Sequence, residues 1–471
     1  MSSPFNEEKY KALLEGLEIS EVMLSEVKEC SYSARWDSTF FLKEFLDKEK
    51  IYAKWEKLSQ ICVIKSGTTP RDRDERLKCG VILLKTNDIR NNVLFSGNEY
   101  FYISDSCNRT MLSSELKPKD ILINIVGATT EVVGRVAFVP ENFPQANITQ
   151  AMSFLRLKSD TINSETLFVF LQSKYGINQT RRIARPTGQY NINNEELGSY
   201  RIPSFTIKSQ SKIENIVRVS YSNLQHSKLL YSEAENILLS ELGLKDWQPN
   251  HNPVNIKQLK ESLMTSGRLD AEHYQVKYDE LESIIKSAPH KTIAEIQQFN
   301  ARGMQPDYVQ TGEVPVVNSK HILEDGLDYD NFERTTTTFL NSHKRAQIGY
   351  GDILIYTTGA NIGRTQVYLK DEPSIASNHV NILRVRDVNP IYLALVLNSQ
   401  VGRLQTEKLC TGSAQVELYP SDIEKFIIPI LDTTIQESIS AKIQEGFALK
   451  TESKRLLDEA KMMVEKEIEK G

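Results

Sequence analysis

Cysteine is scarce in this chain, and the first segment lacks the pattern of a secretory signal. The five cysteines are odd in number and scattered, and none lies in a CxxC pair; they are Cys30, Cys62, Cys79, Cys107 and Cys410. This usage argues against a disulfide framework and against a zinc site. The acidic N-terminal segment has no basic stretch followed by an apolar run, so neither a signal peptide nor a transmembrane helix is indicated. We expect a cytoplasmic protein with reduced thiols.

The common signatures of nucleotide and metal chemistry are also missing. The sequence has no GxxxxGK[ST] phosphate loop, no GxGxxG after a strand and no HExxH. Asn389-Pro390-Ile391-Tyr392 comes close to the Asn-Pro-Pro-Tyr motif of adenine methyltransferases, but it lacks the second proline and an upstream glycine-rich cofactor loop. We interpret it as the start of a helix with proline in the first turn. We therefore expect no catalytic residue, no metal site and no cofactor in this chain.

The formal net charge of -5 disfavours binding to nucleic acid by the whole surface. Contact with DNA would have to be concentrated in local basic patches. Three such clusters occur: Arg71, Arg73, Arg76 and Lys78; Arg181, Arg182 and Arg185; Lys344 and Arg345. Each cluster taken alone is more often a solvated surface.

The most informative feature is an internal repeat, in which the two halves match in the same order. Asp120-Ile121-Leu122-Ile123 returns as Asp352-Ile353-Leu354-Ile355, and a Gly-Arg pair follows each of them. The remaining matches are Ser33 to Asp37 with Ser266 to Asp270, Gly67 to Pro70 with Gly303 to Pro306, Ser173 to Gly176 with Ser399 to Gly402, Gly188 with Gly412, Ile202-Pro203 with Ile428-Pro429, and Gln210 and Ile213 with Gln436 and Ile439. Two long copies imply two similar globular domains related by an approximate two-fold.

Each copy has the pattern of a mixed α/β domain. Short apolar runs at 81–84, 121–123 and 132–139 alternate with turn residues and predict strands. Residues 165–171 and 392–397 carry apolar side chains on too many faces for an exposed helix, so we expect two buried helices.

A long helix is predicted at the end of each copy. Residues 210–242 contain no proline, and Val217, Leu224, Tyr231 and Leu238 recur every seven residues. About 33 residues at a rise of 1.5 Å would span roughly 50 Å. The second copy ends in the same way, and two helices that each carry one apolar stripe would bury it most economically as an antiparallel coiled coil. Packing of each helix on its own domain is the alternative.

These features predict an α+β protein in which a pair of long antiparallel helices separates two similar mixed α/β domains. We expect domains at 1–208 and 254–434, the first with an N-terminal lead. The spacer helices would occupy 209–253, with a linker rich in proline and asparagine at its end, and 435–471.

The ordered series resembles the specificity subunits of Type I restriction-modification systems. The resemblance covers nearly the whole chain from Ser33 onward. It is carried by Ser66 to Pro70, Gly80 to Ile89, Asp120 to Ile123, Gly134 to Ala137, Ile202-Pro203 and Gln210 to Ile213, together with their counterparts in the second half. The N-terminal lead is longer than usual, and Ala301 to Pro306 departs from Ser-Gly-Thr-Thr-Pro, which leaves the exact system open.

The resemblance implies a non-catalytic chain that recognises double-stranded DNA. Each repeat would read one half of a bipartite target, and the helices would fix the gap between the halves. The implied partners are two methyltransferase subunits and motor-nuclease subunits, which would hold S-adenosylmethionine, ATP and magnesium. A stand-alone DNA-modifying enzyme or a protein-binding scaffold remains an alternative, and the missing cofactor motifs disfavour the enzyme.

Recognition of base edges requires donors and acceptors aimed into a groove, whereas phosphate contacts add affinity without sequence information. The candidate DNA-binding residues lie on expected loops and strand ends. In the first copy they are Thr68, Thr69, Lys85, Thr129, Arg181, Arg182, Arg185 and Gln189; in the second they are Arg302, Gln305, Lys320, Thr357, Asn361, Arg364 and Gln415. Arg135 and Arg364 would serve equally well as structural ion-pair partners.

Overall fold

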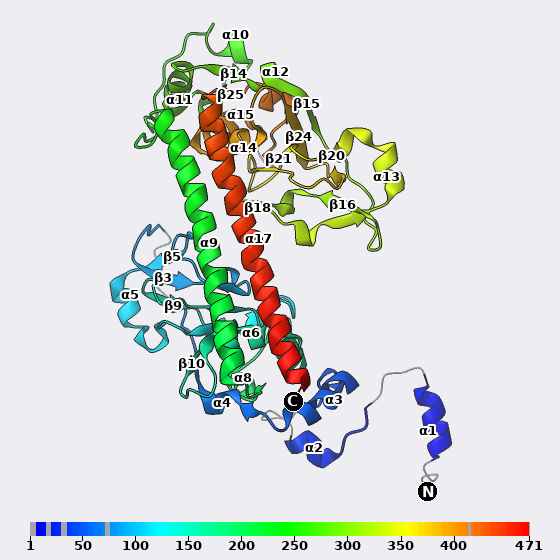
Figure 1. Ribbon diagram of the computed structural model, residues 1–471. Helices are drawn as coiled ribbons and strands as arrows, with labels where there is room; N and C mark the ends of the chain where they lie inside the picture. The colour runs from blue at the N-terminus through cyan, green and yellow to red at the C-terminus, as the bar shows by residue number, and fades with distance from the viewer. Residues whose placement is uncertain (1–5, 16–19, 30–34, 71–75, 413–415, 471) are drawn as a thin grey trace. The chain divides into compact units, whose positions relative to one another are not determined.

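The computed structural model describes residues 6–15, 20–29, 35–70, 76–412 and 416–470. It divides into two compact units (Figure 1). The first unit comprises residues 1–225 and 451–471, and the second comprises 226–450. Each unit therefore contains part of the long helix α9 (Ile207–Glu241) and part of the C-terminal helix α17 (Thr433–Lys470). Within the described ranges, no helix combines the length and the apolar character needed to cross a membrane.

The first unit is built around a five-stranded sheet with strand order β2-β10-β6-β8-β4 and a three-stranded sheet with order β5-β3-β9. A third sheet has the order β11-β12-β7, and β1 pairs with β13. The strands are β1 (Glu56–Lys57), β2 (Cys62–Ser66), β3 (Val81–Leu84), β4 (Asn92–Val93), β5 (Phe101–Ile103), β6 (Ile121–Asn124), β7 (Val126–Gly127), β8 (Val136–Phe138), β9 (Ala146–Ile148), β10 (Met152–Leu157), β11 (Arg185–Thr187), β12 (Gln189–Asn191) and β13 (Arg201–Ile202).

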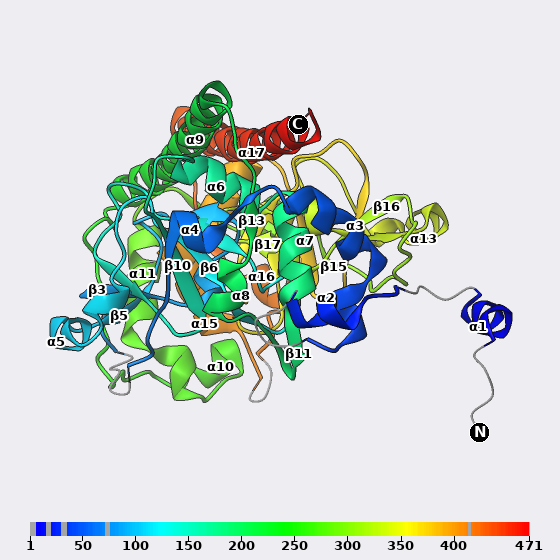
Figure 2. The ribbon, with the colours of Figure 1, turned by 90° about the horizontal axis from the view of Figure 1, so that it is seen from below.

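The first unit also contains short helices and 3-10 turns. They are α1 (Glu7–Leu14), α2 (Leu24–Glu29), α3 (Lys43–Tyr52), α4 (Leu58–Ile61), α5 (Asp105–Arg109), α6 (Ser164–Leu171), α7 (Lys174–Ile183) and α8 (Asn194–Gly198), with 3-10 turns η1 (Ser38–Phe41), η2 (Thr86–Asp88) and η3 (Leu112–Ser114). Figures 1 and 2 both show α6 beside the first part of α9. The amide of Asn163, the N-cap of α6, donates to Gln210 Oε1 on α9 at 2.8 Å, which joins the two helices.

The second unit contains two four-stranded sheets with orders β15-β24-β21-β22 and β19-β16-β23-β20. β14 pairs with β25, and β17 with β18. The strands are β14 (His290–Thr292), β15 (Gln297–Arg302), β16 (Val314–Val317), β17 (Ile322–Leu323), β18 (Gly326–Leu327), β19 (Glu333–Thr335), β20 (Gln347–Ile348), β21 (Ile353–Tyr356), β22 (Thr365–Val367), β23 (Ser374–Ala376), β24 (Val380–Val385) and β25 (Ile427–Pro429).

Its helices follow the order seen in the first unit. They are α10 (Leu263–Ser266), α11 (Val276–Lys286), α12 (Ile293–Ile296), α13 (Thr337–Ser342), α14 (Pro390–Asn398), α15 (Gln400–Leu409) and α16 (Pro420–Ile423), with 3-10 turns η4 (Ala271–Tyr274), η5 (Ser319–His321), η6 (Tyr329–Asn331) and η7 (Lys344–Ala346).

The predicted strands and buried helices are confirmed, with one difference in length. Every residue of β3 is buried, as its unbroken apolar run predicts, and every residue of α6 is buried as well. β8 is shorter than the expected strand at 132–139 because the amide of Val132 donates to Thr129 O in a turn, and Gly134 has a φ of +84°. Asn389 caps α14 through the amides of Ile391 and Tyr392, so its motif is a helix start, as expected.

The two long helices pack against each other in each unit. In the first unit, Ser220 Oγ on α9 donates to Ser453 O on α17 at 2.8 Å. In the second unit, Lys442 Nζ donates to Glu233 at 2.6 Å, and Gly446 faces Ser227. The residue nearer the start of α9, Ser227, contacts Gly446, and the later residue Glu233 contacts Lys442, which comes earlier in α17. The two helices are therefore antiparallel. The predicted helix at 210–242 and the antiparallel pairing are both confirmed.

Candidate nucleic-acid interface

In the first unit, loops that follow four different strands meet at one end of the sheets. The Thr68 amide donates to Ile148 O at 3.1 Å, and the Thr149 amide donates to Leu84 O at 3.3 Å. The amide of Ile125 donates to Ala151 O at 3.0 Å and adds the loop that follows β6. We call these segments the strand-end loops of the first unit: residues 67–70, 85–88, 125–131 and 149–151. They place Thr68, Thr69, Lys85 and Thr129 in one region.

The second unit builds the same arrangement from its own sequence. The Met304 amide donates to Ala376 O at 2.9 Å, and the Thr357 amide donates to His379 O at 3.1 Å. The amide of Ser377 donates to Val317 O, which brings in the loop after β16. The strand-end loops of the second unit are residues 303–306, 318–320, 357–362 and 377–379. They carry Gln305, Lys320, Thr357 and Asn361.

A glycine makes the close approach of these loops possible in both units. A Cβ atom on Gly67 would lie 2.0 Å from Ile148 O, and one on Gly303 would lie 2.1 Å from Ala376 O. Backbone atoms cannot move aside as the end of a flexible side chain can, so only glycine fits at these two positions. The glycines matched in the sequence therefore have the same structural role.

A short hairpin lies beside the strand-end loops of the first unit. β11 and β12 are joined at Gly188, which has a φ of +80°, and Tyr190 on β12 pairs with Gly127 on β7. Gln189 is exposed at the start of β12. The second unit has bridges from Glu417 to Thr411 and Thr358 at the matching place. Gln415 lies outside the described residues, as do Arg71 and Arg73 of the first basic cluster.

Most of the predicted basic residues are held in ion pairs inside their own unit. Their partners are Glu49 for Arg182 at 2.9 Å, Glu196 for Arg185, Glu417 for Arg302 at 3.3 Å, Glu333 for Lys320 and Glu324 for Arg364 at 3.2 Å. Arg182 also stacks on Phe40, and Lys85 lies 3.9 Å from the ring centroid of Phe101. These carboxylates partly neutralise the cations, so contact with DNA phosphates stays a prediction for each of them.

The polar candidates differ in accessibility. Thr357 is buried, and its hydroxyl donates to His379 O at 3.0 Å, which turns the side chain inward. Thr68, Thr129, Gln189, Gln305 and Asn361 are exposed, as is the charged side chain of Arg181. A hydrogen bond from Thr129 lowers the pKa of the neighbouring Glu131 carboxyl, which therefore carries a negative charge at neutral pH. Thr69 is half-buried, and its hydroxyl oxygen accepts from the Gln150 amide.

The sequence did not indicate two residues that line this region of the second unit. The Arg302 guanidinium lies 4.7 Å from the ring centroid of Tyr419, which is 43% exposed. Glu417 bonds to both side chains, and its hydrogen bond to Tyr419 lowers the pKa of its carboxyl. Glu417 and Tyr419 lie more than 100 residues from Arg302 in the sequence and meet it only in the folded unit, so spacing along the chain gave no signal for them.

The first unit has a different set of side chains at the same place. Asn194 Nδ2 donates to Ser66 Oγ at 2.9 Å, and Ser153 Oγ donates to Asn194 Oδ1 at 2.6 Å. These residues lie beside a depression of about 460 Å³ whose lining also includes Arg185 and Asn191. The frame of the two sites is shared, but the side chains that it presents differ. Such a pair of sites fits two different ligand surfaces.

Comparison with known proteins finds a family match in the second half of the chain. Residues 290–460 match the family described as "Type I restriction modification DNA specificity domain". No curated relative matches the chain. The chain is similar to the crystal structure of a Type-I restriction-modification system S subunit from M. genitalium, with 13% identity over 88% of this chain and 94% of that one and a TM-score of 0.40. It is also similar to the HsdS subunit from Thermoanaerobacter tengcongensis, with 13% identity, coverage of 88% and 96%, and a TM-score of 0.27. Scores below 0.5 do not establish a common fold.

The matched domain covers most of the second unit, and the first unit repeats its elements, its glycine contact and its capping hydrogen bonds. Residues 290–460 therefore match a Type I restriction modification DNA specificity domain, and the elements of the first unit repeat those of the matched region.

Proposed function

We propose that each unit reads one half of a bipartite DNA target with its strand-end loops. The observation that supports this proposal is that two segments with different side chains form the same loop cluster, one around Gly67 and the other around Gly303. A shared frame with different exposed groups is what recognition of two unlike half-sites requires. In this proposal the recognition domains are residues 1–208 and 254–434.

Within each cluster, the exposed amides and hydroxyls are the base-reading candidates. Gln189 and Asn361 each offer a donor and an acceptor on one side chain, which suits adenine. Thr68, Thr69, Thr129 and Gln305 can also reach a base edge. Arg181, Arg182, Arg185, Lys320 and Arg364 are the candidates for phosphate contact, which fixes orientation without reading sequence. Lys85, Arg302, Thr357 and Gln415 complete the proposed set.

We further propose that the length of the helix pair sets the gap between the two half-sites. α9 has 35 residues and α17 has 38, and each runs without interruption through both units. A continuous helix is a suitable spacer because it has a fixed rise of 1.5 Å for each residue. The spacer segments in this proposal are 209–253 and 435–471.

The chain would act in the cytoplasm as the non-catalytic member of a larger complex. Its proposed partners are two DNA methyltransferase subunits and motor-nuclease subunits, which would hold S-adenosylmethionine, ATP and magnesium. In this arrangement the chain selects the site, and the partners carry out the chemistry.

Purification from the native cell tests the proposal. The tagged chain is isolated with its co-purifying proteins, which are identified and quantified by mass spectrometry, and DNA methylation is then measured with labelled S-adenosylmethionine. We expect a DNA methyltransferase in about two-fold excess, and methyl transfer only when that subunit is present. Methyl transfer by the chain alone would contradict the non-catalytic role, and recovery of no DNA-modifying partner would contradict the complex.

A further inference from the structure

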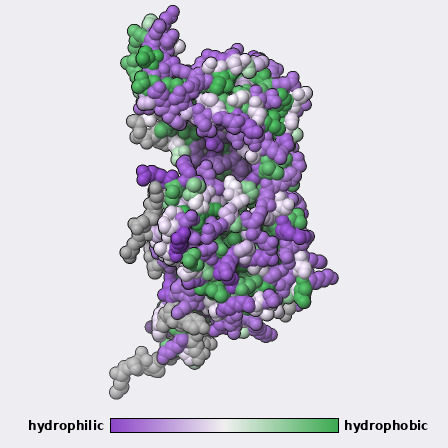
Figure 3. Space-filling model, turned by 90° about the vertical axis from the view of Figure 1, so that its left-hand side faces the viewer, coloured by the Kyte–Doolittle hydropathy of each residue, from purple (hydrophilic) through white to green (hydrophobic). Residues whose placement is uncertain are grey.

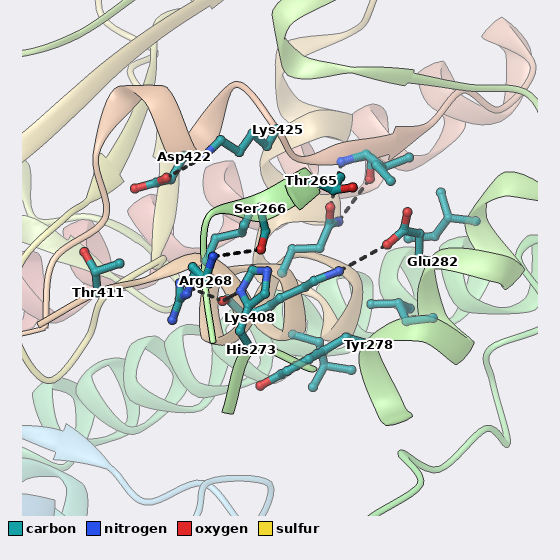
Figure 4. A pocket seen from close by; sticks show the side chains of 16 residues that line it. Thr265, Ser266, Arg268, His273, Tyr278, Glu282, Lys408, Thr411, Asp422 and Lys425 are labelled. Atoms are coloured by element: carbon teal, nitrogen blue, oxygen red, sulfur yellow. Dashed lines mark hydrogen bonds and ion pairs between the residues drawn. The ribbon is translucent and has the colours of Figure 1, made fainter. Parts of the chain in front are cut away.

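The second unit contains a cavity that lies away from its strand-end loops. The cavity has a volume of about 330 Å³ and lies between η4, α11 and α15 (Figure 4). Leu281, Ile285 and Leu404 contribute apolar walls. An apolar cavity of about 150 Å³ can bind benzene, so this space is large enough for an aromatic side chain.

The first unit builds the same three-element frame from η1, α3 and α7. Two ion pairs recur at matching positions: Arg35–Asp37 with Arg268–Asp270, and Arg182–Glu49 at 2.9 Å with Lys408–Glu282 at 3.2 Å. Adjacent rings also recur, because Phe40 and Phe41 meet edge-on at 5.0 Å between ring centroids, and His273 and Tyr274 at 4.8 Å. The two frames can therefore be compared position by position.

The first unit fills the matching space with its own aromatic ring. Tyr52 is buried, and its hydroxyl donates to Asn178 Oδ1 at 3.1 Å. Its ring centroid lies 4.9 Å from that of Trp55 and 6.5 Å from that of Tyr175. Tyr52 follows Arg35 at the same distance in sequence as Ile285 follows the matched Arg268, so Ile285 is the counterpart of Tyr52.

The partner of that tyrosine is replaced as well. Asn178 follows the N-cap Ser173 at the same distance as Leu404 follows the N-cap Ser399, so Leu404 is the counterpart of Asn178. The second unit has therefore lost both the tyrosine ring and the side-chain oxygen that holds its hydroxyl. The cavity occupies the space that an intramolecular aromatic group fills in the first unit.

The charged residues around the cavity are already paired, which decides the kind of ligand. Lys408 holds Glu282 at 3.2 Å, and Lys425 holds Asp422 at 2.9 Å (Figure 4). Arg268 is paired with Asp270. An anionic ligand would have to displace these carboxylates, whereas a neutral aromatic ring can enter between the apolar walls and leave the ion pairs intact.

Exposed apolar side chains lie next to the charged residues that line the cavity. Thr265, Ser266 and Arg268 line the cavity, and Met264 and Leu269, which flank them in sequence, are 73% and 74% exposed. Figure 3 shows hydrophobic side chains at the upper end of this face, where α10 lies. Exposed apolar side chains beside a hollow with apolar walls are typical of a protein docking site, in which an aromatic anchor fills a pocket.

We propose that the cavity between η4, α11 and α15 receives an aromatic side chain of a protein partner, with apolar neighbours of that side chain packing on Met264 and Leu269. Among the described residues of the first unit, Tyr52 stands at this place, so we expect no equivalent pocket there. The two recognition units would thus be unequal in partner binding. The proposal does not depend on which DNA sequence either unit reads.

Two probes and one filled variant test the proposal on the full chain. The probes are p-cresol, which is the tyrosine side chain, and the blocked peptide Lys-Leu-Tyr-Leu-Lys, with Lys-Leu-Ala-Leu-Lys as its control; binding is followed by ligand-observed NMR. The double substitution Ile285→Tyr and Leu404→Asn places the first unit's pair in the second unit. We expect the tyrosine peptide to bind about tenfold or more tightly than p-cresol, because its leucines bury further apolar area.

The filled variant should lose binding of both probes without losing thermal stability. The pair Met264→Ala and Leu269→Ala should remove the advantage of the peptide and leave binding of p-cresol unchanged. If the double substitution does not fold, Leu404→Phe fills the same space with one change. The proposal is overturned if the tyrosine peptide does not bind, if filling the cavity leaves its binding unchanged, or if p-cresol binds as tightly as the peptide, which would indicate a site for a small aromatic molecule.

Discussion

Arg156 donates two hydrogen bonds to Asp120, from Nε to Oδ1 at 2.8 Å and from Nη2 to Oδ2 at 2.7 Å. Asp120 is fully buried, so the guanidinium provides the charge that balances its carboxylate. Arg384 and Asp352 form the same bidentate pair in the second unit, at 2.7 and 3.0 Å. The aspartate that opens the repeated Asp-Ile-Leu-Ile motif is therefore the buried half of an ion pair, directly before β6 in the first unit and β21 in the second.

Removal of either arginine should destabilise its own unit. Arg156→Ala leaves the Asp120 carboxylate buried without its partner, which we expect to cost about 3 kcal/mol of unfolding free energy. Urea denaturation, with limited proteolysis to locate the loosened unit, measures the effect. Arg109→Ala, an exposed arginine on α5, is the control and should change stability by less than about 0.5 kcal/mol. An equally small effect of Arg156→Ala would contradict the role of the pair.

The close backbone approach at Gly303 should not tolerate a methyl group. Gly303→Ala places a Cβ atom 2.1 Å from Ala376 O, so the strand-end loops of the second unit must separate. We expect loss of recognition by that unit and a destabilisation of about 2 kcal/mol or more. Gly349→Ala is the matched control because a Cβ there meets nothing within 4 Å. Similar behaviour of the two variants in DNA binding would show that the approach does not matter.

Substitutions in the two units should affect different halves of the DNA target. Gln189→Ala should relax base preference in one half-site, and Asn361→Ala should relax it in the other, because each side chain belongs to a different unit. We expect about 1–3 kcal/mol of lost discrimination at one base pair for each variant. Long-read sequencing of the methylated motif in cells that carry each variant gives the result. A change in both halves, or the same half for both variants, would refute separate reading.

Phosphate contact has a different signature. Arg181→Ala should weaken binding to all DNA sequences alike and reduce the slope of log affinity against log salt by about 0.9. Titrations of the purified complex at four salt concentrations measure this slope. An unchanged slope together with an altered base preference would instead assign Arg181 to base reading.

The helix pair allows the gap to be changed by a known amount. Seven residues inserted after Gln225 in α9 and seven after Lys450 in α17 add two turns to each helix and keep the heptad register. The added length is about 10 Å, which corresponds to about three base pairs of DNA. The methylated motif should keep both halves and gain about three base pairs between them. An unchanged gap would exclude the helices as the spacer.

The sequence predicted the parts of the fold that depend on local pattern. The heptad of Val217, Leu224, Tyr231 and Leu238 predicted α9, and the unbroken apolar runs predicted β3 and β6. The repeat predicted the two units because matched residues such as Gly67 and Gly303 make the same contact. These features are visible in a single sequence because each depends on neighbours in the chain or on its second copy.

The sequence could not predict which side chains are available at the site. Arg182 lies in the last turn of α7 and not on the expected loop or strand end, and its partner Glu49, like Glu417 for Arg302, comes from a distant segment. Thr357 is turned inward by a hydrogen bond to a neighbouring strand end. The cavity beside Ile285 is also invisible in the sequence, since it arises from what two packed helices leave unfilled.

The central claim is that this chain selects a bipartite DNA target for methylation. Its most direct test is the methylated-base map of the native strain, obtained by long-read sequencing, with the gene intact, deleted and restored. The account predicts that one two-part adenine-methylated motif with a fixed gap disappears on deletion and returns on restoration. A map that is unchanged on deletion, or the loss of an uninterrupted motif, would contradict it.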